Sequence, residues 1–193
     1  MDEKLKESKV AQTILDVAQD LLQERGYNAF SYRDLSRQVG IQTSSIHYYF
    51  PTKEDLAKAL TVRYRDHFRV ALSQIDEQTQ NPKTKLELYL RLFTESFKSS
   101  NRVCLCSMLA TDFANLPEPV QEEIKNLFAD NERWLTKVLE AGREQGVLKF
   151  EGAPELKAKA IFAALEGATI SARTFEDEGR IACVTDWLKS ILE

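Results

Sequence analysis

The sequence predicts an all-α fold, and three observations carry this prediction. Gly and Pro are scarce, at 7 and 5 of 193 residues, and they lie between the periodic segments. Apolar residues recur every three or four positions in nearly every segment, which is the spacing of one helix face. No segment gives a convincing strand pattern. We expect nine helices, over residues 10–25, 32–39, 43–49, 53–77, 86–99, 104–113, 118–145, 154–175 and from Gly179 to 192.

Capping residues mark the boundaries of the two shortest N-terminal helices. Ser31 and Asp34 have the spacing of a capping box, in which each side chain bonds the other residue's backbone N–H. Gly40 stops this helix. Thr43 is expected to cap the next one, and Pro51 ends it, because proline cannot continue a helix.

The helices over 32–39 and 43–49 are joined by Gly-Ile-Gln, and they predict a helix-turn-helix. Its second helix would be available for the major groove of DNA. The polar tips of this helix would be left outside, where they suit base edges and phosphate oxygens; they are Thr43, Ser44, Ser45, His47, Tyr48 and Tyr49. The alternative is that its aromatic residues are ordinary core residues, above all Phe50 and Tyr49.

Charge is distributed unevenly. The net charge is −4 and the sequence pI is about 5.4, so the chain lacks the overall basic field of many nucleic-acid binders. Residues 1–68, however, hold ten Lys+Arg and ten Asp+Glu, and the stretch 31–53 carries a net charge of +2. We therefore expect a mildly basic DNA-facing part whose non-specific affinity is modest and sensitive to salt.

Other features of the sequence restrict the location and the class of protein. No apolar run approaches the roughly 18 residues of a membrane span, and the first residues lack the apolar core of a signal peptide. Three cysteines fit a reducing compartment better than a disulfide framework. We expect a cytoplasmic protein with no membrane, metal or cofactor, and no catalytic pattern of an enzyme.

The stretch FSYRDLSRQVGIQTSSIHYYFPTKEDLAKAL resembles the DNA-binding domain of the TetR family of bacterial repressors. The resemblance covers about residues 8–68. It implies a homodimer that binds a palindromic operator in double-stranded DNA, and a ligand-binding and dimerisation domain over 75–193. The DNA-contacting positions that it implies are Ser31, Arg33, Thr43, Ser44, His47, Tyr48 and Lys53. Many members of the family have Tyr at the position of His47, so the base preference does not transfer.

The last two helices carry apolar stripes that we expect to form the dimer interface as a four-helix arrangement. The residues chosen for this role are Phe162, Leu165, Ile181, Val184, Trp187 and Leu188. The alternative is that both stripes face the core of their own subunit.

Residues on the middle helices are candidates for an apolar pocket that takes a small apolar or aromatic effector. They are Phe93, Phe97, Met108, Phe113 and Trp134. Taken one at a time, each of them fits an ordinary core position as well.

The segment RVCLCSML contains a candidate redox or electrophile sensor. Cys104 follows Arg102 near an expected helix start, and both features lower the pKa of a thiol. The segment resembles the NemR-like, electrophile-sensing branch of the same family, in which a cysteine followed by leucine heads this helix. Cys106 is expected on the opposite side of the helix, facing the interior. The alternative is that both cysteines are small buried hydrophobic residues.

The sequence therefore favours a DNA-binding repressor released by a ligand or by cysteine modification. A ligand-independent helical DNA-binding adaptor is the main alternative. A helical small-molecule-binding protein or an enzyme is a weaker one.

Overall fold

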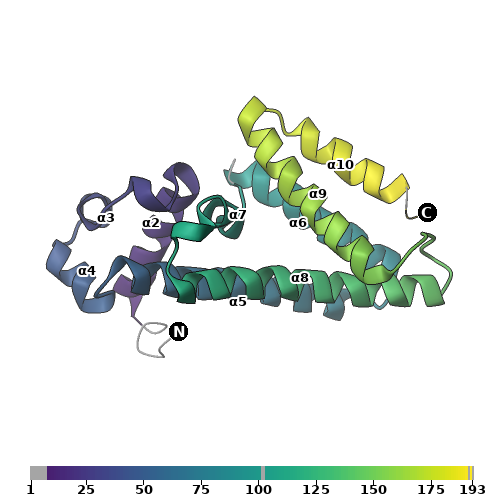
Figure 1. Ribbon diagram of the computed structural model, residues 1–193, viewed down its shortest axis with the longest axis horizontal. Coiled ribbons are helices and arrows are strands. Elements are labelled where there is room, and N and C mark those ends of the chain that lie inside the picture. The colour runs from purple at the N-terminus through teal and green to yellow at the C-terminus, as the bar shows by residue number, and fades with distance from the viewer. Residues whose placement is uncertain (1–7, 101–102, 191, 193) are drawn as a thin grey trace. The chain divides into compact units, whose positions relative to one another are not determined.

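The computed structural model describes residues 8–100, 103–190 and 192, and Figure 1 shows its helices in chain order. This described part holds nine α-helices and no strand, which confirms the all-α prediction. Two short 3₁₀ turns, Tyr27–Ala29 and Phe113–Asn115, lie between helices. The α-helices are α2 (Lys9–Arg25), α3 (Tyr32–Val39), α4 (Thr43–Tyr49), α5 (Lys53–Gln78), α6 (Pro82–Ser100), α7 (Leu105–Ala110), α8 (Glu118–Glu144), α9 (Pro154–Phe175) and α10 (Gly179–Ser190).

The chain forms two compact units. One contains the residues up to His67 together with Cys104–Leu127, and the other contains Phe68–Val103 and Phe128–Glu193. The sequence instead assigned all residues from 75 onward to a single C-terminal domain. Residues 104–127 join the N-terminal unit because α7 packs against α2, and because Arg65 of α5 pairs with Glu123 of α8 at 3.1 Å.

The core of the N-terminal unit is formed where α3 and α4 meet α2 and the first turns of α5. Its fully buried side chains include Ile14, Leu15, Leu35, Ile46 and Leu60. Apolar burial of this kind contributes about 1.5–3 kcal/mol for each large aliphatic side chain. The capping box of Ser31 and Asp34 is present as predicted, and Gly40 ends α3 in the left-handed conformation at φ 76°.

The start of α4 differs from the prediction. Thr43 is the first helical residue rather than the cap, and Gln42 occupies the capping position without a side-chain hydrogen bond. A second capping box begins α5, in which the Thr52 hydroxyl accepts from the Asp55 N–H and the Asp55 carboxylate accepts from the Thr52 N–H, each at 3.0 Å. The segment 50–52 is therefore a short connection between the end of α4 at Tyr49 and the start of α5 at Lys53.

The second unit is built from α6, α9 and α10 with the adjoining parts of α5 and α8. Aromatic rings fill its interior. Tyr89 stacks on Trp134 with centroids 5.3 Å apart, and Phe162 makes edge contacts with Phe93 at 6.5 Å and with Phe128 at 5.0 Å. Within the described residues, no helix is long and apolar enough to cross a membrane.

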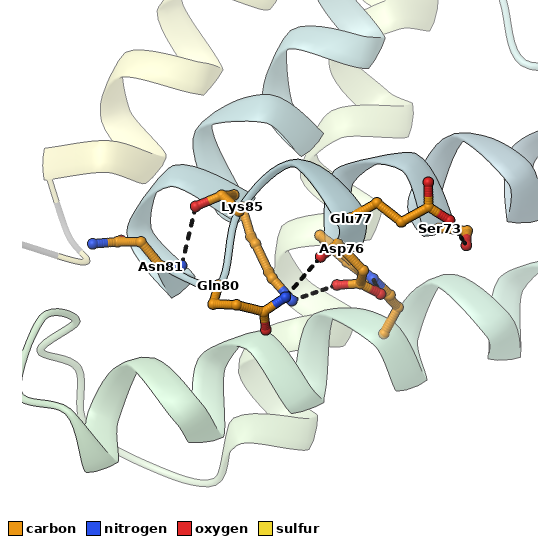
Figure 2. A network of polar contacts seen from close by, with 8 residues as sticks. Ser73, Asp76, Glu77, Gln80, Asn81 and Lys85 are labelled. Carbon is orange, nitrogen blue, oxygen red and sulfur yellow. Dashed lines mark hydrogen bonds and ion pairs between the residues drawn. The ribbon is translucent and has the colours of Figure 1, made fainter.

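A polar network ties three helices of this unit together (Figure 2). The Asp76 carboxylate of α5 accepts from the Lys85 ammonium of α6 at 2.6 Å and from the Trp134 indole N–H of α8 at 3.0 Å. Gln80 closes the turn between α5 and α6 by donating its side-chain amide to the Asp76 carbonyl at 2.9 Å. The network therefore holds the end of α5 against both neighbours.

Candidate functional site

Helix α4 presents a polar outer surface. Ile46 is its only buried residue, and it anchors the helix in the core. Ser44 and His47 are exposed, and the Tyr48 side chain is 66% exposed. Tyr48 rests edge-on against Tyr49, with centroids 5.1 Å apart. Hydroxyl and imidazole groups therefore lie on one accessible side of a short helix that follows a tight turn, which is the arrangement that reads base edges in a groove.

The loop after α4 is held by side chains from α3 and α4. The Tyr32 hydroxyl of α3 hydrogen-bonds the carbonyl oxygens of Phe50, at 2.8 Å, and of Thr52. The His47 ring places Nδ1 3.0 Å from the Pro51 carbonyl oxygen and packs on the Tyr32 ring with centroids 4.7 Å apart. Three successive carbonyls are thus bonded by two side chains, and α4 has a defined orientation.

Tyr32 remains a hydrogen-bond donor across the physiological pH range. Burial raises the pKa of its phenol far above the ordinary value, and the nearby Asp55 carboxylate and Tyr27 add to this rise. A protonated phenol is needed for the bonds to the carbonyl oxygens, which only accept. The raised pKa therefore keeps the phenol in the form that the hydrogen bonds to Phe50 and Thr52 require.

Lys53 is engaged inside the protein rather than pointing freely outward. Its ammonium donates to the Phe30 carbonyl at 2.6 Å and lies 4.4 Å from the centre of the Phe30 ring and 4.8 Å from that of Tyr27. Burial lowers the pKa of this ammonium, opposed by the Asp34 carboxylate. Lys53 therefore ties the start of α5 to the segment before α3, and its role as a phosphate contact stays a prediction.

The remaining predicted DNA contacts lie at the starts of the two short helices. Arg33 is exposed in the first turn of α3. The Ser31 hydroxyl accepts from the Asp34 N–H in the capping box, and it also donates to the Asp34 carboxylate at 2.6 Å. Thr43 is half-buried at the start of α4. All three belong to the same compact unit as His47 and Tyr48.

Cys104 is half-buried and sits immediately before α7. Its sulfur accepts hydrogen bonds from the Cys106 thiol, the Ser107 N–H, the Tyr64 hydroxyl and the Cys106 N–H, and together these lower the pKa of the Cys104 thiol although burial opposes them. Donors directed at one sulfur favour its thiolate, the reactive form. The predicted contribution of Arg102 lies outside the described residues.

The expectation that Cys106 lies on the opposite side of the helix from Cys104 is wrong. Helical spacing applies only within a helix, and Cys104 precedes the helix with the non-helical angles φ −47° and ψ 132°. Its side chain therefore turns back toward Cys106, whose thiol donates to it. Cys106 is fully buried, as predicted, and Cys183 is exposed.

The five candidate pocket residues are divided between the two compact units. Phe93, Phe97 and Trp134 belong to one, and Met108 and Phe113 belong to the other. Phe93 and Phe97 are buried side chains. Trp134 lines an open cavity of about 430 Å³ whose other walls are mixed in polarity and include Asp76, Lys85, Lys137 and Val138. The effector pocket stays a prediction.

The predicted interface residues also divide into two groups. Phe162, Leu165, Ile181 and Leu188 are at most 3% exposed inside their own unit, so they are core residues and do not offer a surface to a second chain. Val184 is half-buried and Trp187 is 54% exposed. The stripes were misassigned because the largest apolar residues of α9 and α10 pack against α6 and against each other.

A different face of these helices is exposed and apolar or small. On α9 it comprises Ala163, Gly167 and Ile170, at helical spacing, and on α10 it comprises Cys183 and Trp187. Ile170 is 44% exposed. Exposed apolar faces of this kind mark interaction surfaces more often than isolated exposed residues do.

Two residues of these sites were missed at the level of sequence. Tyr32 looks like an ordinary apolar residue of a short helix, and its partners are backbone carbonyls 18 and 20 residues away. Tyr64 lies among alternating charged and aromatic residues on α5, and its contact with Cys104 spans 40 positions of chain. No local pattern marks either residue.

Comparison with known proteins gives the family. A model of bacterial regulatory proteins of the tetR family matches residues 14–60, and a model of the tetracyclin repressor-like C-terminal domain matches residues 83–187. The HTH-type transcriptional repressor NemR of Escherichia coli K12 is 23% identical over 169 residues, which cover 84% of this chain and 85% of NemR.

Solved structures agree with this assignment. A TetR-family transcriptional regulator from Agrobacterium tumefaciens is 33% identical and superposes with a TM-score of 0.92, covering 95% of this chain and 98% of its own. A TetR transcriptional regulator from Legionella pneumophila is 32% identical with a TM-score of 0.88, covering 96% and 98%. The chain is therefore a DNA-binding transcriptional regulator of the TetR family.

Proposed function

We propose that this regulator is a homodimeric repressor that places α4 in the major groove at each half of a palindromic operator. The observation that supports this most is the surface of α4, in which Ile46 is buried while Ser44, His47 and Tyr48 face outward. Arg33, at the exposed start of α3, suits a phosphate oxygen beside the groove.

The proposed dimer uses the exposed faces of α9 and α10. Small residues at Ala163 and Gly167 permit close approach of a second helix, and Trp187 supplies a large apolar contact of the kind enriched in interfaces. A two-fold dimer would set two recognition helices about 34–36 Å apart, which is one turn of DNA. The operator should therefore be an inverted repeat.

Selection from random duplex DNA with the full chain tests this function. We expect an inverted repeat to be enriched, and we expect Tyr48→Ala to weaken binding to it by roughly tenfold, the effect of one or two lost hydrogen bonds. Leu156→Ala is the matched control, because Leu156 is equally exposed, at 67%, but lies at the start of α9. The proposed DNA-binding surface would be refuted if no inverted repeat were enriched, or if both variants lost the same amount of DNA affinity.

A second proposal concerns release from DNA through Cys104. The donors around its sulfur favour a thiolate, and the half-buried position leaves it accessible to a small electrophile or oxidant. Adding a group there has to displace the Cys106 or Tyr64 contact. Because α7 packs on α2, and α2 on α3, this disturbance begins within the unit that carries the helix-turn-helix.

Operator release by N-ethylmaleimide tests the thiol proposal. We expect the wild-type chain to lose operator affinity on treatment, whereas Cys104→Ser should keep it. Mass spectrometry of each cysteine identifies the modified site. If Cys104→Ser is released as readily as the wild type, modification of Cys104 is not the cause of release, and the thiol proposal is refuted.

A further inference from the structure

His47 is the residue of the proposed DNA surface whose hydrogen-bonding state is set by the fold. Its Nδ1 lies 3.0 Å from the Pro51 carbonyl oxygen, four residues further along the chain. A carbonyl oxygen can only accept a hydrogen bond, so Nδ1 must carry the proton. In a neutral imidazole the other nitrogen, Nε2, then has no proton and is an acceptor.

The ring has little freedom to leave this arrangement. The Tyr32 ring packs against it at 4.7 Å with an interplanar angle of 55°, and Tyr32 is itself anchored through its hydroxyl to the carbonyls of Phe50 and Thr52. The imidazole nevertheless remains exposed on the outer side of α4. A side chain that is oriented before binding loses little entropy when DNA arrives.

We propose that His47 is a specificity-determining residue that reads an exocyclic amino group in the major groove through Nε2 as an acceptor. This inference rests on the proposed DNA-binding mode of α4. In the major groove, N4 of cytosine and N6 of adenine offer donors, whereas N7 and O6 of guanine and the phosphate oxygens offer only acceptors. A neutral nitrogen that only accepts can bond the amino groups of cytosine and adenine, and it is repelled by the acceptor atoms of guanine and of the phosphates.

This property separates His47 from the other polar groups of α4. Hydroxyls of serine, threonine and tyrosine both donate and accept, so they can contact bases or phosphates without discrimination. The Pro51 carbonyl removes that freedom from His47. The position should therefore distinguish cytosine or adenine from guanine on the strand that it faces.

The first test measures the tautomer directly, without DNA. Nitrogen-15 NMR of the full chain at about pH 8, where imidazoles are generally neutral, should show the His47 proton on Nδ1. The chain has two histidines, so His67→Gln leaves a single imidazole and makes the assignment unambiguous. A proton on Nε2 would overturn the inference even if the chain binds its operator well.

The second test compares the wild type with His47→Asn. The side-chain amide of this variant can still donate to the Pro51 carbonyl but does not reach as far as Nε2 of the imidazole. In selection from random DNA, the wild type should prefer cytosine or adenine over guanine at one position of each half-site, by roughly three- to tenfold. His47→Asn should fold normally and lose this preference. Retention of the full preference in His47→Asn would overturn the inference.

The two tests separate the possible failures. A wild-type chain that enriches no site would refute the DNA-binding mode and, with it, this reading role. The wild-type chain could instead enrich an inverted repeat whose base preferences are the same in His47→Asn. That result would leave the DNA-binding mode intact and refute only the role of His47.

Discussion

Removal of the Tyr32 hydroxyl should loosen the loop that ends the recognition helix. Tyr32→Phe keeps the ring and its contact with His47 but deletes the bonds to the Phe50 and Thr52 carbonyls. The Thr52 oxygen retains the Leu56 N–H at 3.2 Å, so the loss is concentrated on the Phe50 oxygen. Leaving one buried acceptor unpaired costs about 1–3 kcal/mol.

This cost predicts measurable changes in stability and in DNA affinity. For a chain of this length, 1 kcal/mol lowers the Tm by about 2–4 °C, so a cost of about 1–3 kcal/mol should lower the Tm of Tyr32→Phe by about 2–12 °C in a calorimetric scan. Operator affinity should fall by a few fold, because the loop and α4 become less ordered before binding. Fluorescence anisotropy with the selected operator, well below the Tm, measures this second effect.

Tyr89→Phe is the matched control. Its hydroxyl is also buried and donates to the Asn131 side chain at 3.0 Å, but it belongs to the other compact unit. This variant should lose comparable stability and keep its operator affinity. The reasoning is refuted if Tyr32→Phe melts like the wild type, or if the two variants weaken operator binding equally.

Three further results are expected. Because the pKa of Tyr32 is raised in the folded state, the protonated phenol contributes its full stabilisation of the fold below the ordinary tyrosine pKa of about 10 and loses it as the pH rises above that value. Tyr32→Phe should therefore flatten the decline in the free energy of unfolding at alkaline pH, and an unchanged decline contradicts this. Trp187→Glu should raise the dimer dissociation constant by roughly a hundredfold or more in sedimentation, and an unaltered dimer removes α10 from the interface. Cys106→Ala should slow the alkylation of Cys104 near neutral pH, since its thiol is the main donor that lowers the Cys104 pKa; an equal rate shows that the donor has no effect.

The helical framework could be predicted because its signals are local. A capping box needs only Ser31 and Asp34, and a left-handed helix end needs only a glycine such as Gly40. The polar exterior of α4 follows from a single apolar anchor at Ile46. These features depend on neighbours within four residues, so the sequence alone carries them.

The errors arose where a residue's surroundings are distant in the chain. Cys104 was given helical geometry, yet it lies outside the helix and its Tyr64 donor comes from α5. On α9, two faces carry apolar residues, and periodicity cannot decide which face meets the core. The structure buries the face that carries Phe162 and Leu165 and exposes the face that carries Ala163, Gly167 and Ile170, because the first face meets α6 and α10.

The position of α7 provides a path from the proposed modification at Cys104 to the proposed DNA surface. An effector releases DNA only if it binds better to a state that binds DNA poorly. Since α7 contacts α2 and α2 contacts α3, a group attached to Cys104 can disfavour the DNA-binding arrangement through two successive helix contacts. Both contacts lie inside one compact unit. The proposed release through Cys104 therefore does not require an effector cavity in the unit formed by α6, α9 and α10, and the response of Cys104→Ser separates it from the proposed release by a ligand.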